Sequence, residues 1–208
     1  MFKLFWRAFV THFFWRPRFG ALGSRSVIFK PLLLIGTSRM FFGQRVRIRE
    51  FARIEIIHRP KLGWDATLRI GSNVNIEQGV HIVCQCDINI EDNVSITPYC
   101  AIVDTFHPHD PPDVGQKIGD RLPTAPSFVH IGAGTFIGMR TLILPNVRIG
   151  KGCVIGAGSI VNTDIPDYSV AVGSPAQVVS TFDPTIRKWK KFIRKSCALP
   201  DSNIANHN

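Results

Sequence analysis

The sequence predicts an all-β fold, a parallel β-helix built from six-residue repeats. Aliphatic side chains recur at every sixth position near the end of the chain, at Ile131, Ile137, Ile143, Ile149, Ile155 and Val161. Glycine often follows them, as at Gly132, Gly138, Gly150 and Gly156. A period of six fits neither a helix nor an alternating strand, but it is typical of stacked short strands and turns. Because one repeat cannot bury its own apolar face, several must stack.

The same period occurs earlier in the chain, which sets the predicted domain boundaries. It includes Phe42, Ile48 and Ile54, then Ile70, Ile76, Ile82 and Ile88, and after a shift of two residues Ile90, Ile96 and Ile102. We therefore expect the β-helix to occupy residues 42–182. Residues 1–41 would precede it and residues 183–208 would follow it. The shift of two residues indicates a small insertion on the outside of the helix.

The repeat is interrupted between Ile102 and Ile131, and the interruption predicts an extruded loop over residues 103–130. This segment contains Pro108, Pro111, Pro112, Pro123 and Pro126, so it cannot form a coil of the β-helix. The repeat restarts in phase after it, which favours a loop over a domain linker. A loop longer than about 12–15 residues in a compact domain is usually functional or disordered.

Both ends of the chain carry helical patterns. Phe2, Trp6, Phe9 and Phe13 recur at helical spacing between basic residues, which predicts a basic amphipathic helix over residues 1–16. Such a helix can lie at the inner face of the cytoplasmic membrane, or it can pack on the body or on a partner subunit. At the other end, Ile186, Trp189 and Ile193 predict a basic helix that caps the open end of the stack.

Charge and cysteine content narrow the classes of partner. Residues 1–59 contain 12 Lys/Arg and 2 Asp/Glu, residues 60–183 contain 7 and 12, and residues 184–208 contain 6 and 1. The repeat body is thus mildly acidic, and we do not expect a nucleic-acid partner.

No apolar run reaches the ~18 residues of a membrane span, and no clear signal peptide is present, so we expect a cytoplasmic protein. Cys84, Cys86 and Cys153 lack metal-binding spacing and are expected in the core.

The segment from Asp104 to Asp110 contains the candidate catalytic residues. It opens the long loop and places His107 and His109 where the rigid scaffold meets a covering segment. Histidine is the side chain best suited to accept a proton near neutral pH. The alternative is a surface loop in which the two histidines have no catalytic role.

Three features together resemble a known family: the hexapeptide tract, the His107-Pro108 pair, and the segment IGAGSIVNTDIPDYSVAVGSPAQVV at residues 155–179. They resemble the bacterial sugar O-acetyltransferases of the left-handed β-helix superfamily, which include galactoside, maltose and surface-polysaccharide acetyltransferases. The resemblance covers residues 65–182. It implies acetyl-CoA as co-substrate, no metal, and a sugar or surface-glycan precursor as acceptor. It also implies a homotrimer with active sites between subunits.

The resemblance also implies roles for individual residues. His107 would be the general base for direct attack of an acceptor hydroxyl on the thioester. The Met139 backbone amide would stabilise the oxyanion. The acetyl-CoA groove would involve Met139, Ala157, Asn162, Thr163 and Gln177, although Asn162-Thr163 departs from the Thr-Lys pair common in the family. Glu77 and Gln85 fall on the acceptor-contacting positions of the galactoside enzymes, and from their place in the loop we expect Asp104 and His109 to line the same pocket.

Three alternatives remain open at this stage. An N-acetyltransferase acting on a nucleotide-linked amino sugar would keep the fold and the co-substrate. A γ-class carbonic anhydrase would need three histidines on zinc, but His107 and His109 are too close in sequence for its ligand spacing. A non-enzymatic scaffold would use the basic ends of the chain for binding.

Overall fold

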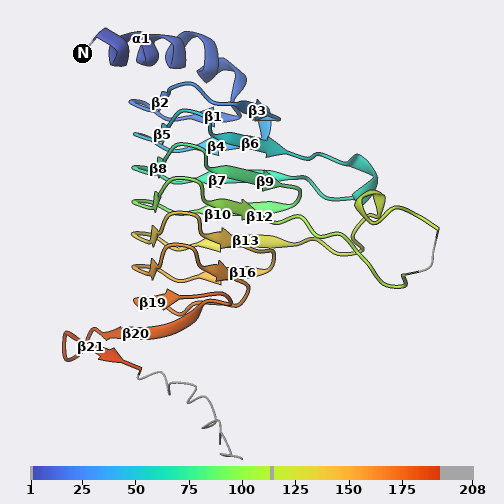
Figure 1. Cartoon of the computed structure of the whole chain (residues 1–208). Helices are drawn as coiled ribbons and strands as arrows, with labels where there is room; N and C mark the ends of the chain where they lie inside the picture. Colours follow the sequence, from blue (N-terminus) through green and yellow to red (C-terminus); the bar gives the residue numbers. More distant parts are fainter. Residues whose placement is uncertain (1, 113–114, 193–208) are drawn as a thin grey trace, which may run out of the picture.

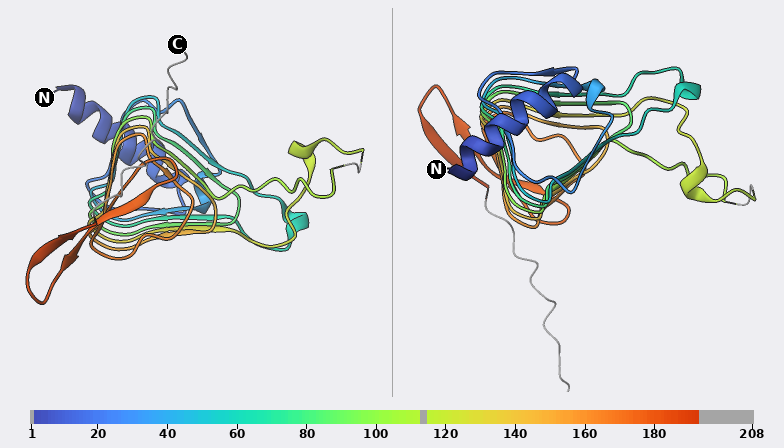
Figure 2. Two further views of the ribbon diagram at one scale, coloured as in Figure 1. Left: turned by 60° about the horizontal axis from the view of Figure 1, so that its bottom comes forward. Right: turned by 90° about the horizontal axis from the view of Figure 1, so that it is seen from above.

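The protein is a triangular prism of stacked coils, with an α-helix across one end and a β-hairpin at the other (Figures 1 and 2). The computed structural model describes residues 2–112 and 115–192. Three sheets form the walls, and within the coils every strand pairs in parallel with the strand of the coil above or below. Three parallel sheets of this kind are consistent with the predicted left-handed β-helix.

We name the three sheets A, B and C. Sheet A contains β1 (Ala21–Leu22), β4 (Met40–Phe42), β7 (Thr67–Ile70), β10 (Asp87–Ile90), β13 (Phe128–Ile131) and β16 (Val147–Ile149). Sheet B contains β2 (Val27–Ile28), β5 (Arg47–Ile48), β8 (Asn75–Ile76), β11 (Ser95–Ile96), β14 (Phe136–Ile137), β17 (Val154–Ile155), β19 (Ser169–Val172), β20 (Gln177–Asp183) and β21 (Lys188–Lys191). Sheet C contains β3 (Leu33–Ile35), β6 (Arg53–Ile56), β9 (His81–Cys84), β12 (Ala101–Val103), β15 (Leu142–Ile143) and β18 (Ile160–Val161).

The residues on the six-residue period fill the interior of the prism. Ile76, Ile96, Ile137 and Ile155 share register positions in sheet B, and each is fully buried. The two-residue phase shift falls at the corner between β9 and β10, where Cys84 and Cys86 also point inward and are buried. Among the described residues the four cysteines are free and buried, which confirms the predicted core positions.

The stack begins earlier than predicted. β1, β2 and β3 pair in parallel with β4, β5 and β6, so a complete coil lies between Ala21 and Ile35. The predicted boundary at residue 42 is therefore too late. Leu22, Ile28 and Leu34 follow the same six-residue period. The helix α1 (Phe2–Val10) continues into the helical turns η1 (Thr11–Trp15) and η2 (Arg16–Arg18), which confirms the predicted N-terminal helix.

The predicted C-terminal capping helix is not observed among the residues that the structure describes. Within the described part of the predicted helix, β21 pairs antiparallel with β20, and the two strands form a hairpin beyond the last coil (Figure 1). The Phe182 and Trp189 rings pack against each other at 5.4 Å, and the Lys190 ammonium contacts the Asp183 carboxylate at 2.8 Å. The edge of β20 thus offers backbone pairing that outweighs the local helical pattern. Ile193 and the remainder of the predicted helix lie outside the described residues.

Candidate active site

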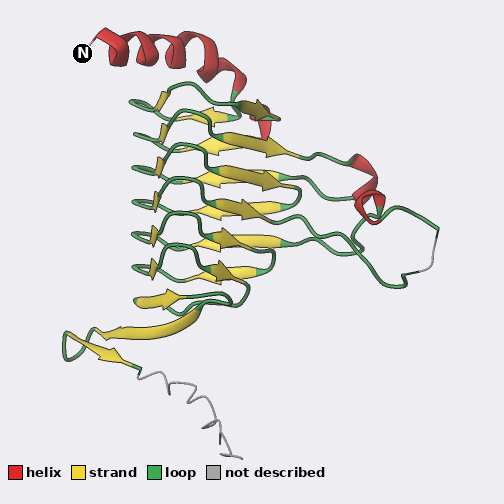
Figure 3. Ribbon diagram, in the orientation of Figure 1, coloured by secondary structure: helices red, strands yellow, loops and turns green. Residues whose placement is uncertain are grey.

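The long loop leaves the prism after β12, at the corner between sheets C and A, and returns at β13. It projects far from the coils (Figure 2). The segment between β6 and β7 contains η4 (Pro60–Leu62) and extends on the same side (Figure 3). η3 (Thr37–Arg39) lies at the same corner, and η5 (Ile118–Asp120) lies within the loop. His107 lies just beyond the root of the loop, and both it and His109 are exposed.

Asp104 holds the root of the loop. Its side chain is fully buried, and its carboxylate accepts hydrogen bonds from the backbone N–H groups of Gln85 and Cys86 at 2.6 and 2.9 Å. The returning end of the loop meets the same residue, because the Ser127 hydroxyl donates to the Asp104 carbonyl. Burial raises the pKa of the Asp104 carboxyl, and the hydrogen bonds from Gln85 and Cys86 oppose that rise. Both ends of the loop that carries His107 are therefore fixed to the coils.

This arrangement corrects the roles implied for Asp104 and Gln85. Both were expected to contact the acceptor, but their side chains are 0% and 4% exposed. The Asp104 carboxylate is also occupied by two backbone donors. These residues are positioned to hold the loop root and not to reach a molecule bound outside the prism.

We expect Asp104→Asn to lower the free energy of unfolding by about 1–3 kcal/mol, because its amide would leave one buried backbone N–H without an acceptor. Urea unfolding followed by circular dichroism measures this change. Asp167→Asn is the matched control, since Asp167 also accepts a backbone hydrogen bond, from Lys151 at 3.0 Å, but is exposed to water. Equal losses for the two variants would contradict a special role for Asp104.

Arg121 organises the loop itself, a role that was not predicted from the sequence. It is 7% exposed, and its guanidinium donates to the carbonyl oxygens of Pro111 at 2.8 Å, Gln116 at 3.3 Å and Pro112 at 3.4 Å. The sequence held one indication of this role, since Arg121 lies close to several prolines. Proline has no N–H group, so nearby carbonyl oxygens lack a local backbone donor and can accept from an arginine. The loop is thus ordered around a buried cation.

The Met139 turn lies at another corner, between sheets B and C, where residues 138–141 join β14 to β15. A Cβ atom on Gly138 would lie 2.5 Å from the backbone nitrogen of Ala157 in the next coil, so glycine permits this close stacking. The Met139 carbonyl accepts from the Gly158 N–H at 2.8 Å. Its own N–H donates to no hydrogen bond within the described part of the chain. The turn therefore presents a free backbone donor beside an exposed side chain.

The other predicted binding residues occupy the two corners that border sheet C. Ala157 is exposed one coil beyond Met139, and half-buried Glu77 lies at the same corner in an earlier coil. Asn162 and Thr163 are exposed at the corner between sheets C and A, and Gln177 is exposed at the start of β20. His107 and Met139 thus lie at opposite edges of sheet C. One chain does not bring the predicted base and the predicted oxyanion donor together.

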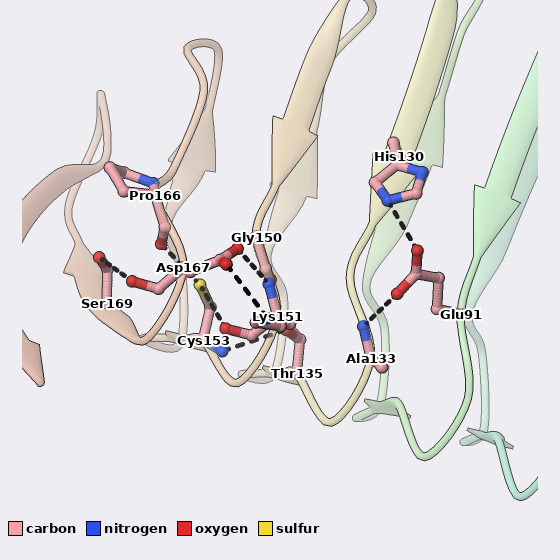
Figure 4. Close-up of polar contacts among 10 residues, drawn as sticks. All are labelled: Glu91, His130, Ala133, Thr135, Gly150, Lys151, Cys153, Pro166, Asp167 and Ser169. Carbon is pink, nitrogen blue, oxygen red and sulfur yellow. Dashed lines mark hydrogen bonds and ion pairs between the residues drawn. The ribbon is translucent and has the colours of Figure 1, made fainter. Parts of the chain in front are cut away.

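A separate polar groove crosses sheet A, and it does not offer a free base. It contains His130, whose Nε2 lies 3.2 Å from a Glu91 carboxylate oxygen (Figure 4). The other Glu91 oxygen accepts the Ala133 N–H at 2.9 Å, and the His130 Nδ1 lies 3.2 Å from the Asn89 amide nitrogen. Both ring nitrogens are therefore engaged. Farther along the groove, Asp167 accepts the Lys151 N–H, so these contacts tie neighbouring coils together (Figure 4).

Within residues 2–112 and 115–192, no three His, Cys, Asp or Glu side chains cluster as metal ligands would. The carbonic anhydrase alternative thus gains no support from the geometry of one chain.

Comparison with known proteins finds acetyltransferase relatives. Residues 128–163 match the bacterial transferase hexapeptide model, which describes six repeats. Over 156 residues the chain is 35% identical to the probable acetyltransferase Rv3034c of Mycobacterium tuberculosis, covering 70% of this chain and 51% of that protein. The chain is therefore related to the hexapeptide-repeat acetyltransferases. It is also 35% identical over 114 residues to the galactoside O-acetyltransferase of Lactococcus lactis, covering 52% of this chain and 53% of that protein.

The chain also resembles a solved structure. The crystal structure of a mutant of AntD, an N-acyltransferase from Bacillus cereus in complex with dTDP and coenzyme A, matches with a TM-score of 0.66 and 21% identity. The match covers 81% of this chain and 87% of AntD, and at this identity it supports the fold alone. The chain spans about half the length of the two relatives named above.

Proposed function

We propose that the protein transfers the acetyl group of acetyl-CoA to a hydroxyl of a sugar or surface-glycan precursor, with His107 as general base. The observation that carries this proposal is an exposed histidine just beyond the buried Asp104 anchor, in a chain related to the hexapeptide-repeat acetyltransferases. The galactoside O-acetyltransferase similarity supports a sugar hydroxyl as acceptor. The exposed residues that flank sheet C would hold the acetyl-CoA.

In the proposed reaction, the His107 imidazole takes the proton of the acceptor hydroxyl while its oxygen attacks the thioester carbonyl carbon. A sugar hydroxyl is a weak nucleophile at neutral pH, so a positioned base contributes about 10²–10⁴-fold. The charge that develops on the carbonyl oxygen would be stabilised by the free Met139 N–H. The C–S bond then breaks, and the imidazolium returns the proton to the departing thiolate.

We further propose that the active unit is a homotrimer packed through sheet C. The outward residues of this sheet are mostly apolar from its third coil onward: Val83, Ala101, Val103, Leu142, Leu144 and Ile160. Sheet A, in contrast, carries outward Arg69, Asp87 and Arg148. The His81 Nε2 atom on sheet C is also buried without a hydrogen-bond partner among the described residues. Burial and the nearby Arg53 lower the pKa of His81, which favours its neutral form at such an interface.

This packing would complete the site. In a cyclic trimer each copy contacts its neighbour through two different patches. If sheet C faces the threefold axis, the C–A corner of one protomer lies beside the B–C corner of the next. His107 of one chain would then face Met139 of its neighbour.

Leu142→Glu is expected to convert the trimer to monomers, because three carboxylates would be buried in an apolar interface. Size-exclusion chromatography with light scattering measures the change in mass. Phe41→Glu is the control, since it places the same charge at an exposed position on sheet A. A Leu142→Glu protein that keeps the native mass would contradict packing through sheet C.

The acceptor class is tested by measuring acetyl-CoA turnover with a panel of sugars, amino sugars, nucleotide sugars and lipid-linked glycans. Treating the product with hydroxylamine distinguishes the bond formed, since it cleaves acetyl esters and leaves acetamides intact. An ester product supports the proposal. A product that resists hydroxylamine, formed on a nucleotide-linked amino sugar, would favour the N-acetyltransferase alternative. No turnover with any acceptor would count against an acetyltransferase.

A further inference from the structure

The N-terminal helix lies across one end of the prism (Figures 1 and 2), and most of its aromatic side chains are exposed. Phe5 is 69% exposed and Phe13 is 63% exposed, and Leu4, Trp6 and Phe9 are each more than half exposed. The rings form a continuous row, with Trp6 stacked on Phe9 at 5.8 Å and Phe9 against Phe13 at 4.5 Å. Large apolar side chains gathered in this way usually mark an interaction site.

A different side of the same helix attaches it to the prism. Thr11 is 2% exposed, and its hydroxyl oxygen accepts the Ile28 N–H at 2.8 Å and donates to the Arg7 carbonyl at 2.7 Å. Trp15 packs against the core. The helix therefore covers the first coil without using its aromatic row, so capping the core does not explain that row.

The same end is strongly basic. The first 49 residues contain ten Lys/Arg and no Asp or Glu. Arg25 and Arg47 line a groove between α1 and sheet B, together with Leu4 and Phe5. Both arginines make no ion pair with any described residue. Apolar rings and unpaired cations thus border the same groove.

We propose that this end of the protein docks on the surface of an anionic lipid bilayer. The α1 rings would enter the boundary between headgroups and acyl chains, and Arg25 and Arg47 would contact lipid phosphates. An amphipathic helix with aromatic residues on one side and cations nearby is suited to this interface. A nucleic acid would satisfy the arginines but would leave the apolar row in water. None of the described helices is long and apolar enough to cross a bilayer.

Assembly into the proposed trimer would strengthen docking on the bilayer. This step rests on the trimer proposed above. Rotation about an axis parallel to the prisms keeps all three helices at the same end. Three weak contacts with one flat surface then act together, because the second and third become intramolecular.

The test is flotation of the full chain with vesicles, without acetyl-CoA or acceptor, so that its result is independent of catalysis. Vesicles of phosphatidylcholine alone are compared with vesicles containing about 30% phosphatidylglycerol, at about 0.1 M salt. We expect binding to the anionic vesicles and a loss of at least about tenfold in the triple variant Phe5→Ser, Phe9→Ser, Phe13→Ser. Arg25→Gln and Arg47→Gln should each weaken anionic binding by about fivefold.

Controls separate specific docking from other effects. Phe136→Ser removes an exposed ring far from α1, and Arg140→Gln removes a cation at a distant turn, so both should bind like the unmodified protein. Circular dichroism of each variant checks that the fold is retained. Failure of the unmodified protein to bind anionic vesicles would overturn the proposal, as would wild-type binding by a folded triple variant. Tighter binding to a single-stranded oligonucleotide, unaffected by the ring substitutions, would also overturn it.

Discussion

His107→Ala is expected to lower kcat by about 10²–10⁴-fold while leaving the fold and the affinity for acetyl-CoA unchanged. The side chain is exposed, so its removal creates no cavity. The loop would keep its position, because Asp104 and Arg121 hold it through backbone groups that the substitution does not touch. Turnover with saturating acetyl-CoA and the best acceptor of the panel measures the effect.

His109→Ala is the comparison that makes this result specific. His109 is exposed in the same loop two residues later, and we expect its loss to raise the acceptor KM more than it lowers kcat. A large kcat loss for His109→Ala with little effect of His107→Ala would reverse the assignment. Full activity in both variants would contradict a mechanism in which a histidine of this loop acts as general base.

Mixing two inactive variants is expected to restore activity if the site lies between subunits. Met139→Pro should remove the free N–H and reduce kcat by about 10²–10³-fold. The turn should tolerate proline, because Arg140 has a φ of 60° and the Thr141 N–H donates to the Gly138 carbonyl, as in a type II turn. Met139→Ala, which keeps the N–H, is the matched control and should stay active.

Random mixing of His107→Ala and Met139→Pro chains in equal amounts should recover about a quarter of wild-type activity, since each mixed trimer has one intact site. The chains are denatured and refolded together, or expressed together, so that subunits exchange. The double variant in one chain, mixed with itself, must stay inactive. No recovery in trimers shown to be mixed would place both groups in one protomer and contradict the proposed packing.

The repeats were predictable because an inward side chain every sixth residue is a local property of each coil. The first coil was not predicted, even though Leu22, Ile28 and Leu34 have the right spacing. Met40 keeps this spacing and is fully buried, but Phe42 also points inward and takes the position that pairs with Leu22, so the period counted from Phe42 is offset by two residues from the earlier one. The predicted C-terminal helix was wrong for a different reason. Its apolar spacing was helical, but the free edge of β20 is a tertiary feature with no local signal.

The candidate site was only partly predictable. A His-Pro pair at the start of the loop pointed to His107, but nothing near Asp104 in the sequence shows that its carboxylate turns inward to two backbone donors. Whether His107 and Met139 lie near each other depends on which corner of the prism each turn occupies. The order of the three sheets along the chain determines these corners. Sequence spacing alone does not give this order.

The regular stacking of the coils also gives the molecule a fixed internal length. The long loop that carries His107 leaves after β12, three parallel steps from β3 in the coil beneath the N-terminal helix. Adjacent strands are about 4.8 Å apart, so the loop root stands about 14 Å from that first coil. With the helix bound to a bilayer, the stack of coils would hold the loop root at a fixed height above the lipid surface. An acceptor anchored in the same bilayer would be modified only where its hydroxyl stands at that height, so the number of coils, and not only the shape of the site, would select the sugar unit.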